Sequence, residues 1–252
     1  LAMVAWVAAA YWALLSSEAF TLWLPAIAFG LLHALGKLHK WSFFSYMLPA
    51  YVVWVQSLAE RRARWKALVV AALSLALFAP WYWSHIALLP SRLFQASADF
   101  AVPFWKGHSW AVYLIQSCGA LGPAAWLLGL VGLAAPQYAR RRDNGWLLVS
   151  WVLVSYVFWT VVPNRQIRFL LPGLAPLAIA LAASWPSPVS WVIAALQVLG
   201  AVNFAFGWVG PVVINAPLIP LVFFDNRPPA REDWKIEEIL KRIDAARDPA
   251  RP

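Results

Sequence analysis

The amino-acid sequence predicts an all-α integral membrane protein, a multispan bundle of about eight transmembrane helices with a short amphipathic segment outside the membrane. Of its 252 residues, 62% are hydrophobic and only 12% are charged, and the mean hydropathy is +0.65. These values lie far outside the range of soluble domains. The 18 tryptophans fit the same class, because the headgroup zone of a bilayer buries the indole ring and keeps its N–H hydrated.

Apolar stretches long enough to cross about 30 Å of hydrocarbon as a helix recur along the chain. They fall near residues 1–16, 20–36, 42–58, 66–83, 110–135, 145–162, 168–184 and 188–209. These stretches are continuously apolar, so helix is the expected structure. We expect the prolines within them to mark kinks or helix ends: Pro49, Pro80, Pro123, Pro172 and Pro176.

Two short connections are densely basic, which indicates the cytoplasmic side by the positive-inside rule. They are ERRARWK at 60–66 and YARRRDNG at 138–145. The connections between and beside them are then expected outside, and they carry the other basic residues of the membrane part: Lys37, Lys40, Arg92, Lys106, Arg165 and Arg168. The loops expected outside contain six basic residues and the two basic loops contain seven, which is a small difference. The predicted orientation in the membrane therefore depends on the clustering of charge in the two short loops.

The composition divides the chain near residue 210. Residues 1–210 are expected to be a transmembrane helical domain, and residues 211–252 an extracytoplasmic tail. The tail includes a predicted amphipathic helix, since its apolar residues recur at helical spacing: Trp234, Ile236, Ile239, Leu240 and Ile243. The chain begins at Leu1 inside an apolar run. We therefore interpret it as an N-terminally truncated fragment, with 1–210 the C-terminal part of a larger domain.

Four cations at the outer ends of spans are the candidate binding residues: Lys37, Lys40, Arg165 and Arg168. Arginine stays protonated, so each guanidinium needs water, a lipid headgroup or an anionic ligand beside it. One interpretation is that each side chain reaches separately to lipid phosphates. The other is a shared anion site, with an apolar tail of the anion lying between the helices. Arg168 is the strongest candidate because apolar residues follow it at once and limit its freedom.

Two segments carry a resemblance to a known family. IRFLLPGLAPLAIALA (167–182) resembles the signature R-[FY]-x-L-P-x-x-P-x-x-A of family 39-type glycosyltransferases, the C-type membrane enzymes related to dolichyl-phosphate-mannose protein mannosyltransferases and bacterial aminoarabinose transferases. AFGLLHALGKLHKWSFFSYMLP (28–49) is similar to their G-L-x-x-G-L-x-x-L-T-K segment, with Lys37 or Lys40 in place of the lysine and no threonine.

Two shorter segments extend the resemblance in the same order along the chain. LALFAPWYW (75–83) resembles a span that ends in a Pro-Trp pair before an external loop, and REDWKIEEILKRI (231–243) resembles a segment that follows the membrane part in bacterial members. The resemblance therefore covers most of the chain, although each motif alone has low specificity.

The resemblance implies a multi-pass enzyme of a bacterial or archaeal plasma membrane, with its C-terminal tail outside. It would transfer a sugar from a polyprenyl-phosphate donor to a glycan, lipid or protein acceptor on the extracytoplasmic side, with inversion. In this interpretation Arg165 and Arg168 hold the donor phosphate with help from Lys37 or Lys40, because preplaced cations stabilise the charge of the leaving group. The resemblance leaves a divalent metal open, and we expect no other cofactor and no nucleic acid.

The general base of this family is an aspartate in the first external loop, often in an acidic pair. The acids of the membrane part are Glu18, Glu60, Asp99 and Asp143, and only Asp99 is expected outside. We therefore expect the base in a part of the protein that precedes this chain. Asp99 is a weaker candidate for positioning an acceptor or a metal, because it and the nearby histidines lack metal-ligand spacing.

Other interpretations remain open at this stage. A transporter or lipid flippase would place paired charges or broken helices near mid-membrane, whereas this chain keeps its charges at span ends. A non-catalytic membrane subunit that only binds lipid phosphate would need no base. His33 lies within a span, where we expect a hydrogen-bonded residue between helices in preference to a proton relay.

Overall fold

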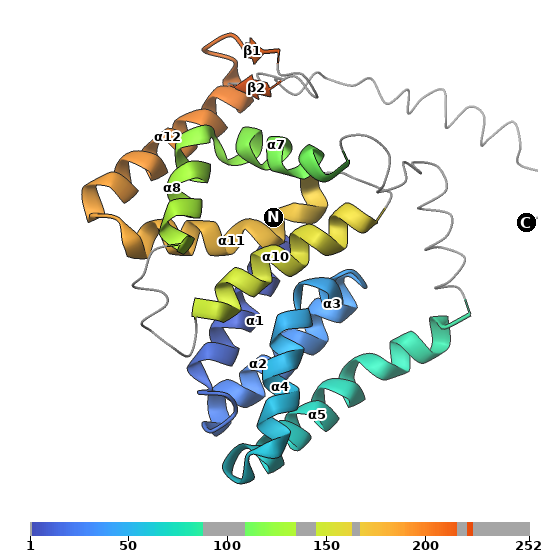
Figure 1. Cartoon of the computed structure of the whole chain (residues 1–252). Helices are drawn as coiled ribbons and strands as arrows, with labels where there is room; N and C mark the ends of the chain where they lie inside the picture. Colours follow the sequence, from blue (N-terminus) through green and yellow to red (C-terminus); the bar gives the residue numbers. More distant parts are fainter. Residues whose placement is uncertain (1, 88–108, 135–144, 163–166, 216–220, 224–252) are drawn as a thin grey trace, which may run out of the picture.

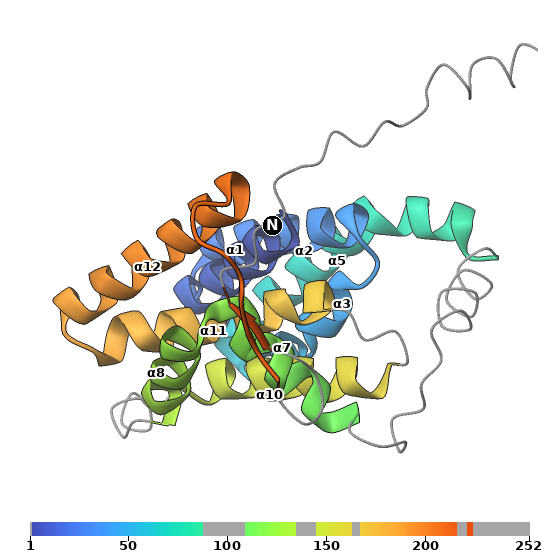
Figure 2. The same ribbon diagram turned by 90° about the horizontal axis from the view of Figure 1, so that it is seen from above.

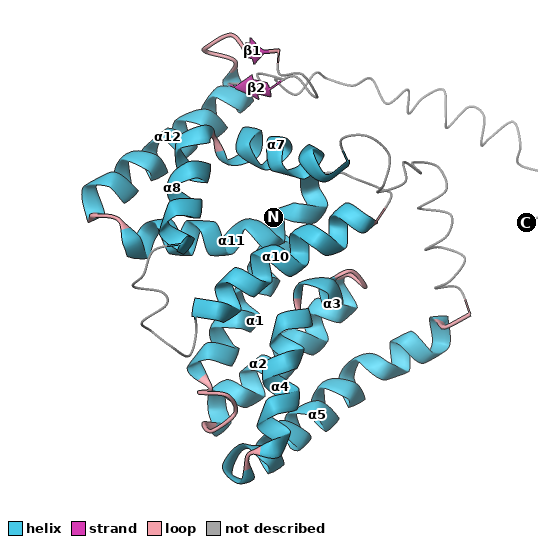
Figure 3. Cartoon of the chain, in the orientation of Figure 1, coloured by secondary structure: helices cyan, strands magenta, loops and turns pink. Residues whose placement is uncertain are grey.

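The computed structural model describes residues 2–87, 109–134, 145–162, 167–215 and 221–223. Within these ranges the protein is helical except for one short two-stranded sheet, as Figure 3 shows. The structure is thus consistent with the predicted helical membrane protein. Several predictions concern residues outside the described ranges: Arg165, Asp99, most of the basic connection 138–145 and the tail helix.

The first five helices form the lower part of the bundle in Figure 1. They are α1 (Ala2–Ser16), α2 (Trp23–His39), α3 (Phe43–Tyr46), α4 (Leu48–Ala59) and α5 (Arg61–His85). Helix α2 packs against α1 and α5, and α4 packs against α5. The short helix α3 joins the end of α2 to the start of α4.

The remaining elements form the upper part of the molecule (Figure 1). They are α7 (Ser109–Leu121), α8 (Pro123–Ala134), α10 (Gly145–Val161), α11 (Ile167–Ser184), α12 (Ser187–Phe206), β1 (Val212–Ile214) and β2 (Leu221–Phe223). Helix α11 packs against α1, α7, α8, α10 and α12, and the view from above in Figure 2 shows it among these helices. The strands pair antiparallel, with Val213 opposite Val222.

Two of the described helices, α5 and α11, are long and apolar enough to cross a membrane alone. The pair α7 and α8 makes a third if the two count as one broken span. The other apolar helices are shorter than a full span, among them α1, α4 and α10. The number of eight spans therefore stays a prediction.

The stretch 110–135, expected as one span, is two helices bent by 113°. The bend lies at Gly122, whose φ of +76° is in the left-handed region, and at Pro123, which begins α8. Proline lacks the N–H that would continue α7, and glycine adopts positive φ without a Cβ clash. The prediction of a kink or helix end at Pro123 is confirmed. The 113° bend fits either one broken span or a re-entrant pair, so the span predicted at 110–135 stays a prediction.

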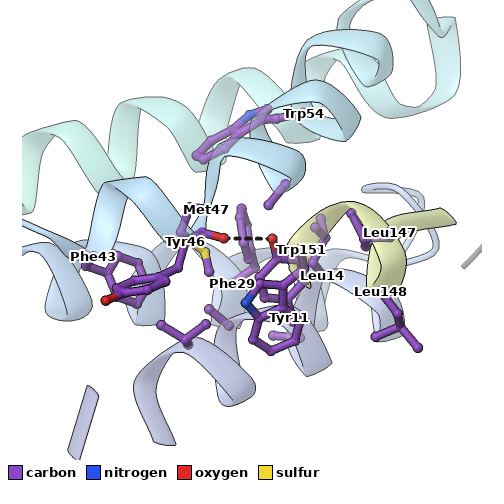
Figure 4. Close-up of a cluster of buried hydrophobic side chains, with 14 of the residues drawn as sticks. Tyr11, Leu14, Phe29, Phe43, Tyr46, Met47, Trp54, Leu147, Leu148 and Trp151 are labelled. Atoms are coloured by element: carbon purple, nitrogen blue, oxygen red, sulfur yellow. Dashed lines mark hydrogen bonds between the residues drawn. The ribbon is translucent and has the colours of Figure 1, made fainter. Parts of the chain in front are cut away.

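The core joins helices from both halves of the chain. In Figure 4, Tyr11 of α1 lies between Tyr46 of α3 and Trp151 of α10. The Tyr11 hydroxyl donates to the backbone carbonyl of Tyr46 over 2.8 Å. Its ring stacks on Trp151 with centroids 3.8 Å apart and planes 7° apart. This contact fixes α3, and with it the corner that follows α2.

Candidate functional site

The candidate site begins where α2 ends. Lys40 follows the last residue of α2 with an extended backbone, and its N–H donates to the carbonyl of Gly36. The chain leaves the helix there and turns into α3. Lys40 is exposed, so its ammonium group is available to a ligand at this corner.

Lys40 and Arg168 meet at the ring of Phe169, at the start of α11. The Lys40 Nζ atom lies 5.1 Å from the ring centroid, and the Arg168 Cζ atom lies 5.2 Å from it. Both distances are within the range of cation–π attraction. The structure therefore brings together two of the four cations that the sequence selects.

The Phe169 ring is itself held in place. It stacks on the buried Trp159 of α10 with centroids 4.9 Å apart and planes 10° apart. The hydroxyl of Tyr46 donates to the backbone carbonyl of Phe169, and the Tyr46 ring lies 5.8 Å from that of Trp159. Because these contacts come from α3 and α10, the position of the cations depends on the packing of three helices.

The electrostatics of this corner favour an anion. Desolvation, and then the nearby charge of Arg168, lower the pKa of Lys40 from its usual value. The positive charge of Arg168 disfavours the protonated form of Lys40, and a negative group beside both side chains would offset that repulsion. A phosphate oxygen suits both, since Arg168 offers a planar set of N–H donors and Lys40 a compact positive charge.

Lys37 lies one turn before Lys40 but in a different environment. Its Nζ atom is 4.2 Å from the ring centroid of Phe78 on α5 and 5.5 Å from that of Tyr51 on α4. The hydroxyl of Tyr82 donates to the Lys37 carbonyl over 3.0 Å. Lys37 is half-buried. It is therefore a neighbour of the Lys40–Arg168 pair and does not share their ring.

His33 connects the helices beneath Lys37. Its Nδ1 atom lies 2.7 Å from the hydroxyl of Ser74, and its Nε2 atom lies 2.8 Å from the hydroxyl of Tyr51. Both partners can donate or accept, so either tautomer of the ring fits. The expectation of a hydrogen-bonded residue between helices is confirmed.

The described acids lie far from the cations. Glu18 precedes α2, which has 17 residues, so about 25 Å of helix separates Glu18 from Lys40. Glu60 follows α4 and is likewise one helix length away from this corner. Neither carboxylate of the described part can neutralise Lys40 or Arg168 at such a distance.

Two hydrogen bonds join the turn before α2 to the end of α4 and the start of α5. Lys66 donates to the carbonyl of Thr21, and Ser57 donates to the carbonyl of Ala19 over 3.2 Å. The turn before α2 and the turn before α5 therefore lie together, away from Lys40 and Arg168. Residues 61–66, expected as a connection, form the first turns of α5, at the end of the bundle opposite to Lys40 and Arg168. Which of the two ends faces the cytoplasm stays a prediction.

Sequence reasoning missed the aromatic part of the site. In the sequence Phe169 is only one of the apolar residues that follow Arg168, and no motif includes Trp159. An aromatic residue directly after a charged residue at a span end is a signal that could have found Phe169. Nothing in the sequence alone pairs Phe169 with Trp159, because they lie on different helices.

No metal site is visible in the part of the chain that the structure describes. Among these residues no group of three or more His, Cys, Asp or Glu lies close enough to hold an ion. Asp99 and Arg165, both sequence candidates, lie outside the described ranges. Of the predicted cations, the structure therefore places Lys37, Lys40 and Arg168.

Comparison with curated proteins adds an independent observation. The chain is similar to bacterial arabinosyl transferases. The undecaprenyl phosphate-alpha-4-amino-4-deoxy-L-arabinose arabinosyl transferase of Pectobacterium carotovorum is 27% identical over 209 residues, covering 74% of this chain and 35% of that protein. Its namesake from Yersinia enterocolitica is 30% identical over 149 residues, covering 57% and 25%. That of Aeromonas salmonicida is 28% identical over 176 residues, covering 63% and 30%.

The chain spans about a third of the length of these curated relatives, or less. No protein-family model matches the chain. No solved structure matches it either. Bacterial aminoarabinose transferases are among the enzymes whose motifs the segments around Lys37 and Arg168 resemble. The similarity thus supports the glycosyltransferase resemblance at the level of the family, without selecting a particular member.

Proposed function

We propose that this chain is part of a membrane glycosyltransferase that moves a sugar from a polyprenyl-phosphate donor to an acceptor on the extracytoplasmic side. The observation that carries the proposal is the pair Lys40 and Arg168 on the ring of Phe169. The similarity to transferases named for an undecaprenyl phosphate sugar supports the nature of the anion.

In this mechanism the two cations act on the leaving group. As the glycosidic bond breaks, negative charge grows on the lipid phosphate. Lys40 and Arg168 are already in place, so they stabilise that charge without reorganising during the reaction. The stacked ring of Phe169 keeps the cations at this corner, and Lys37 is a helper one turn away.

Inversion requires a single displacement at the anomeric carbon. A general base takes the proton of the acceptor hydroxyl, the hydroxyl oxygen bonds to the sugar carbon, and the lipid phosphate departs with the bonding electrons. Glu18 and Glu60 are at the wrong end of the bundle for this role. We propose that the base lies outside the described residues, with Asp99 as the candidate on this chain.

A lipid-phosphate-binding subunit without catalysis is the second candidate. The same cation pair favours it, since binding needs no base. A transporter would also use a broken helix such as the α7–α8 pair, but it would place paired charges near mid-membrane, whereas Lys40 and Arg168 lie at helix ends.

The proposal is tested by replacing Arg168 with Ala in the full-length protein reconstituted in liposomes. Loss of a charge-assisted phosphate contact is expected to weaken donor binding about ten- to a hundredfold. Arg62→Ala is the matched control, because Arg62 is an exposed arginine at the opposite end of the bundle. Binding of undecaprenyl phosphate–aminoarabinose and transfer of its sugar are measured for each variant. Equal effects of the two replacements would exclude the proposed site, and binding without transfer in the wild type would favour the second candidate.

A further inference from the structure

The end of α12 and the sheet that follows it form an apolar hairpin, of which the structure describes residues 206–215 and 221–223. Between Phe169 and Phe224 the sequence contains no Asp, Glu, Lys, Arg or His. The first charged residue after Arg168 is Asp225. A connection that emerges into water normally carries charged residues soon after its helix ends. This one carries none before Asp225, and between Phe206 and Phe224 its polar side chain is that of Asn215.

The described side chains of the apolar hairpin are exposed. Trp208 is 69% exposed and Val213 is 52% exposed, and Phe206, Val209 and Val212 are exposed as well. An apolar surface of this kind marks a contact with a membrane or another protein.

The exposed surface continues along α12. That helix exposes its own large apolar residues to the surroundings: Trp191, Val192, Leu196, Val198 and Leu199. Because α12 is one of the apolar helices of the bundle, its exposed side is the side that would face lipid. The hairpin extends the same surface beyond the helix without an intervening charge.

The backbone of the turn is internally hydrogen-bonded. Gly207 ends α12 with a φ of +67°, and its N–H donates to the Asn203 carbonyl over 2.7 Å. The side chain of Asn203 then pairs with both polar groups of Val209. Its Oδ1 atom accepts from the Val209 N–H over 2.6 Å, and its Nδ2 atom donates to the Val209 carbonyl over 3.1 Å.

The pairing of β1 with β2 continues this pattern from Val212 to Ile214. Backbone polar groups can leave water only when they are paired within the protein. Asn203 is buried. Its side chain supplies hydrogen-bond partners to the backbone of Val209, which lies beyond the end of α12. The turn thus has backbone groups of Gly207 and Val209 paired within the protein, which lowers the cost of contact with lipid.

We propose that the apolar hairpin is inserted into the lipid bilayer, at the boundary between headgroups and acyl chains. The stacked rings of Phe206 and Trp208, with centroids 5.7 Å apart, suit that boundary. The division at residue 210 that composition suggests then falls inside the inserted segment. Arg168 stands at the start of α11 and the hairpin follows the end of α12, so a single crossing by each helix would put both on the same side of the membrane. This proposal does not depend on the sugar-transfer reaction.

The test uses a single fluorescent label in the full chain. Cys118 is replaced by Ser, Val213 by Cys, and the new thiol carries an environment-sensitive NBD label. The protein is reconstituted in liposomes of phosphatidylcholine and phosphatidylglycerol. Emission is quenched either by brominated lipids or by aqueous iodide. Leu196→Cys on the exposed side of α12 is the lipid control, and Arg62→Cys in the exposed, basic first turn of α5 is the aqueous control.

We expect the label at 213 to behave like the label at 196, with blue-shifted emission and quenching by brominated lipid. Quenching by iodide to the level seen at 62 would place the hairpin in water and overturn the proposal. A label protected from both quenchers would also overturn it, since the hairpin would then be covered by protein or by a second copy.

A further variant tests the role of the paired turn. Asn203→Ala leaves the N–H and the carbonyl of Val209 without the Asn203 partner atoms. We expect the label at 213 to become more accessible to iodide in this variant, with the label at 196 unchanged. An unaltered quenching profile would show that the Asn203 pairing does not hold the hairpin in lipid.

Discussion

Lys40 and Arg168 lie against the same aromatic ring, although one follows the end of α2 and the other stands at the start of α11. Two like charges at one ring repel each other, and neither described carboxylate is close enough to offset that repulsion. A bound anion would remove this cost and gain a contact with both groups. The arrangement therefore favours binding over a purely structural role.

Phe169→Leu should weaken donor binding while keeping an apolar side chain at the site. Each cation–π contact contributes about 0.5 to 1 kcal/mol at an exposed site, so losing two of them corresponds to a loss of about tenfold in affinity. Donor affinity is measured by titration calorimetry in detergent or nanodiscs. Phe44→Leu is the control, because Phe44 packs edge-on against Phe158. A similar loss in both variants would contradict a specific role for the Phe169 ring.

The affinity for the donor should fall as the pH rises through the lowered pKa of Lys40. Desolvation and the charge of Arg168 lower this pKa, so Lys40 loses its proton at a lower pH than an ordinary lysine. Deprotonation removes the charge that attracts phosphate. Lys40→Arg stays charged throughout and should move the fall in affinity to higher pH. Identical pH profiles of wild type and variant would exclude Lys40 from the site.

Tyr46→Phe and Tyr11→Phe separate stability from binding. Each variant removes one buried hydroxyl hydrogen bond, and each should lower the free energy of unfolding by about 1 kcal/mol. Only Tyr46 bonds to the carbonyl of Phe169, so only Tyr46→Phe should also weaken donor binding. Unfolding and donor affinity are measured in parallel. Equal donor affinities in the two variants would show that the hydrogen bond from Tyr46 to Phe169 does not contribute to donor binding.

His33→Leu should destabilise the bundle without affecting the chemistry directly. The substitution keeps an apolar volume but leaves Ser74 and Tyr51 without the imidazole partner. Loss of these bonds should lower the free energy of unfolding by about 1 to 3 kcal/mol. His33→Gln, which retains a donor and an acceptor, should recover part of it. Normal stability with lost transfer activity would instead indicate the proton relay that we disfavour.

The sequence by itself determined the class of the protein and the positive charge of its candidate site. Composition and the length of apolar stretches report the solvent that each segment prefers, and this preference does not depend on the final packing. The same reasoning placed Lys37, Lys40 and Arg168 at span ends, because fixed charges avoid the hydrocarbon. It also marked Pro123 as a break. The number of eight spans, and the roles of Arg165 and Asp99, stay predictions.

Tertiary structure decided which of these residues act together. The meeting of Lys40 with Arg168 depends on how α2, α3, α10 and α11 pack, and such contacts between distant segments leave no local signal in a single sequence. The stack of Phe169 on Trp159 was hidden for the same reason. At Pro123 the sequence marked the break, but the angle of 113° depends on how α7 and α8 pack against their neighbours. Side-chain fit between helices selects these arrangements, whereas solvent preference selects only the helices.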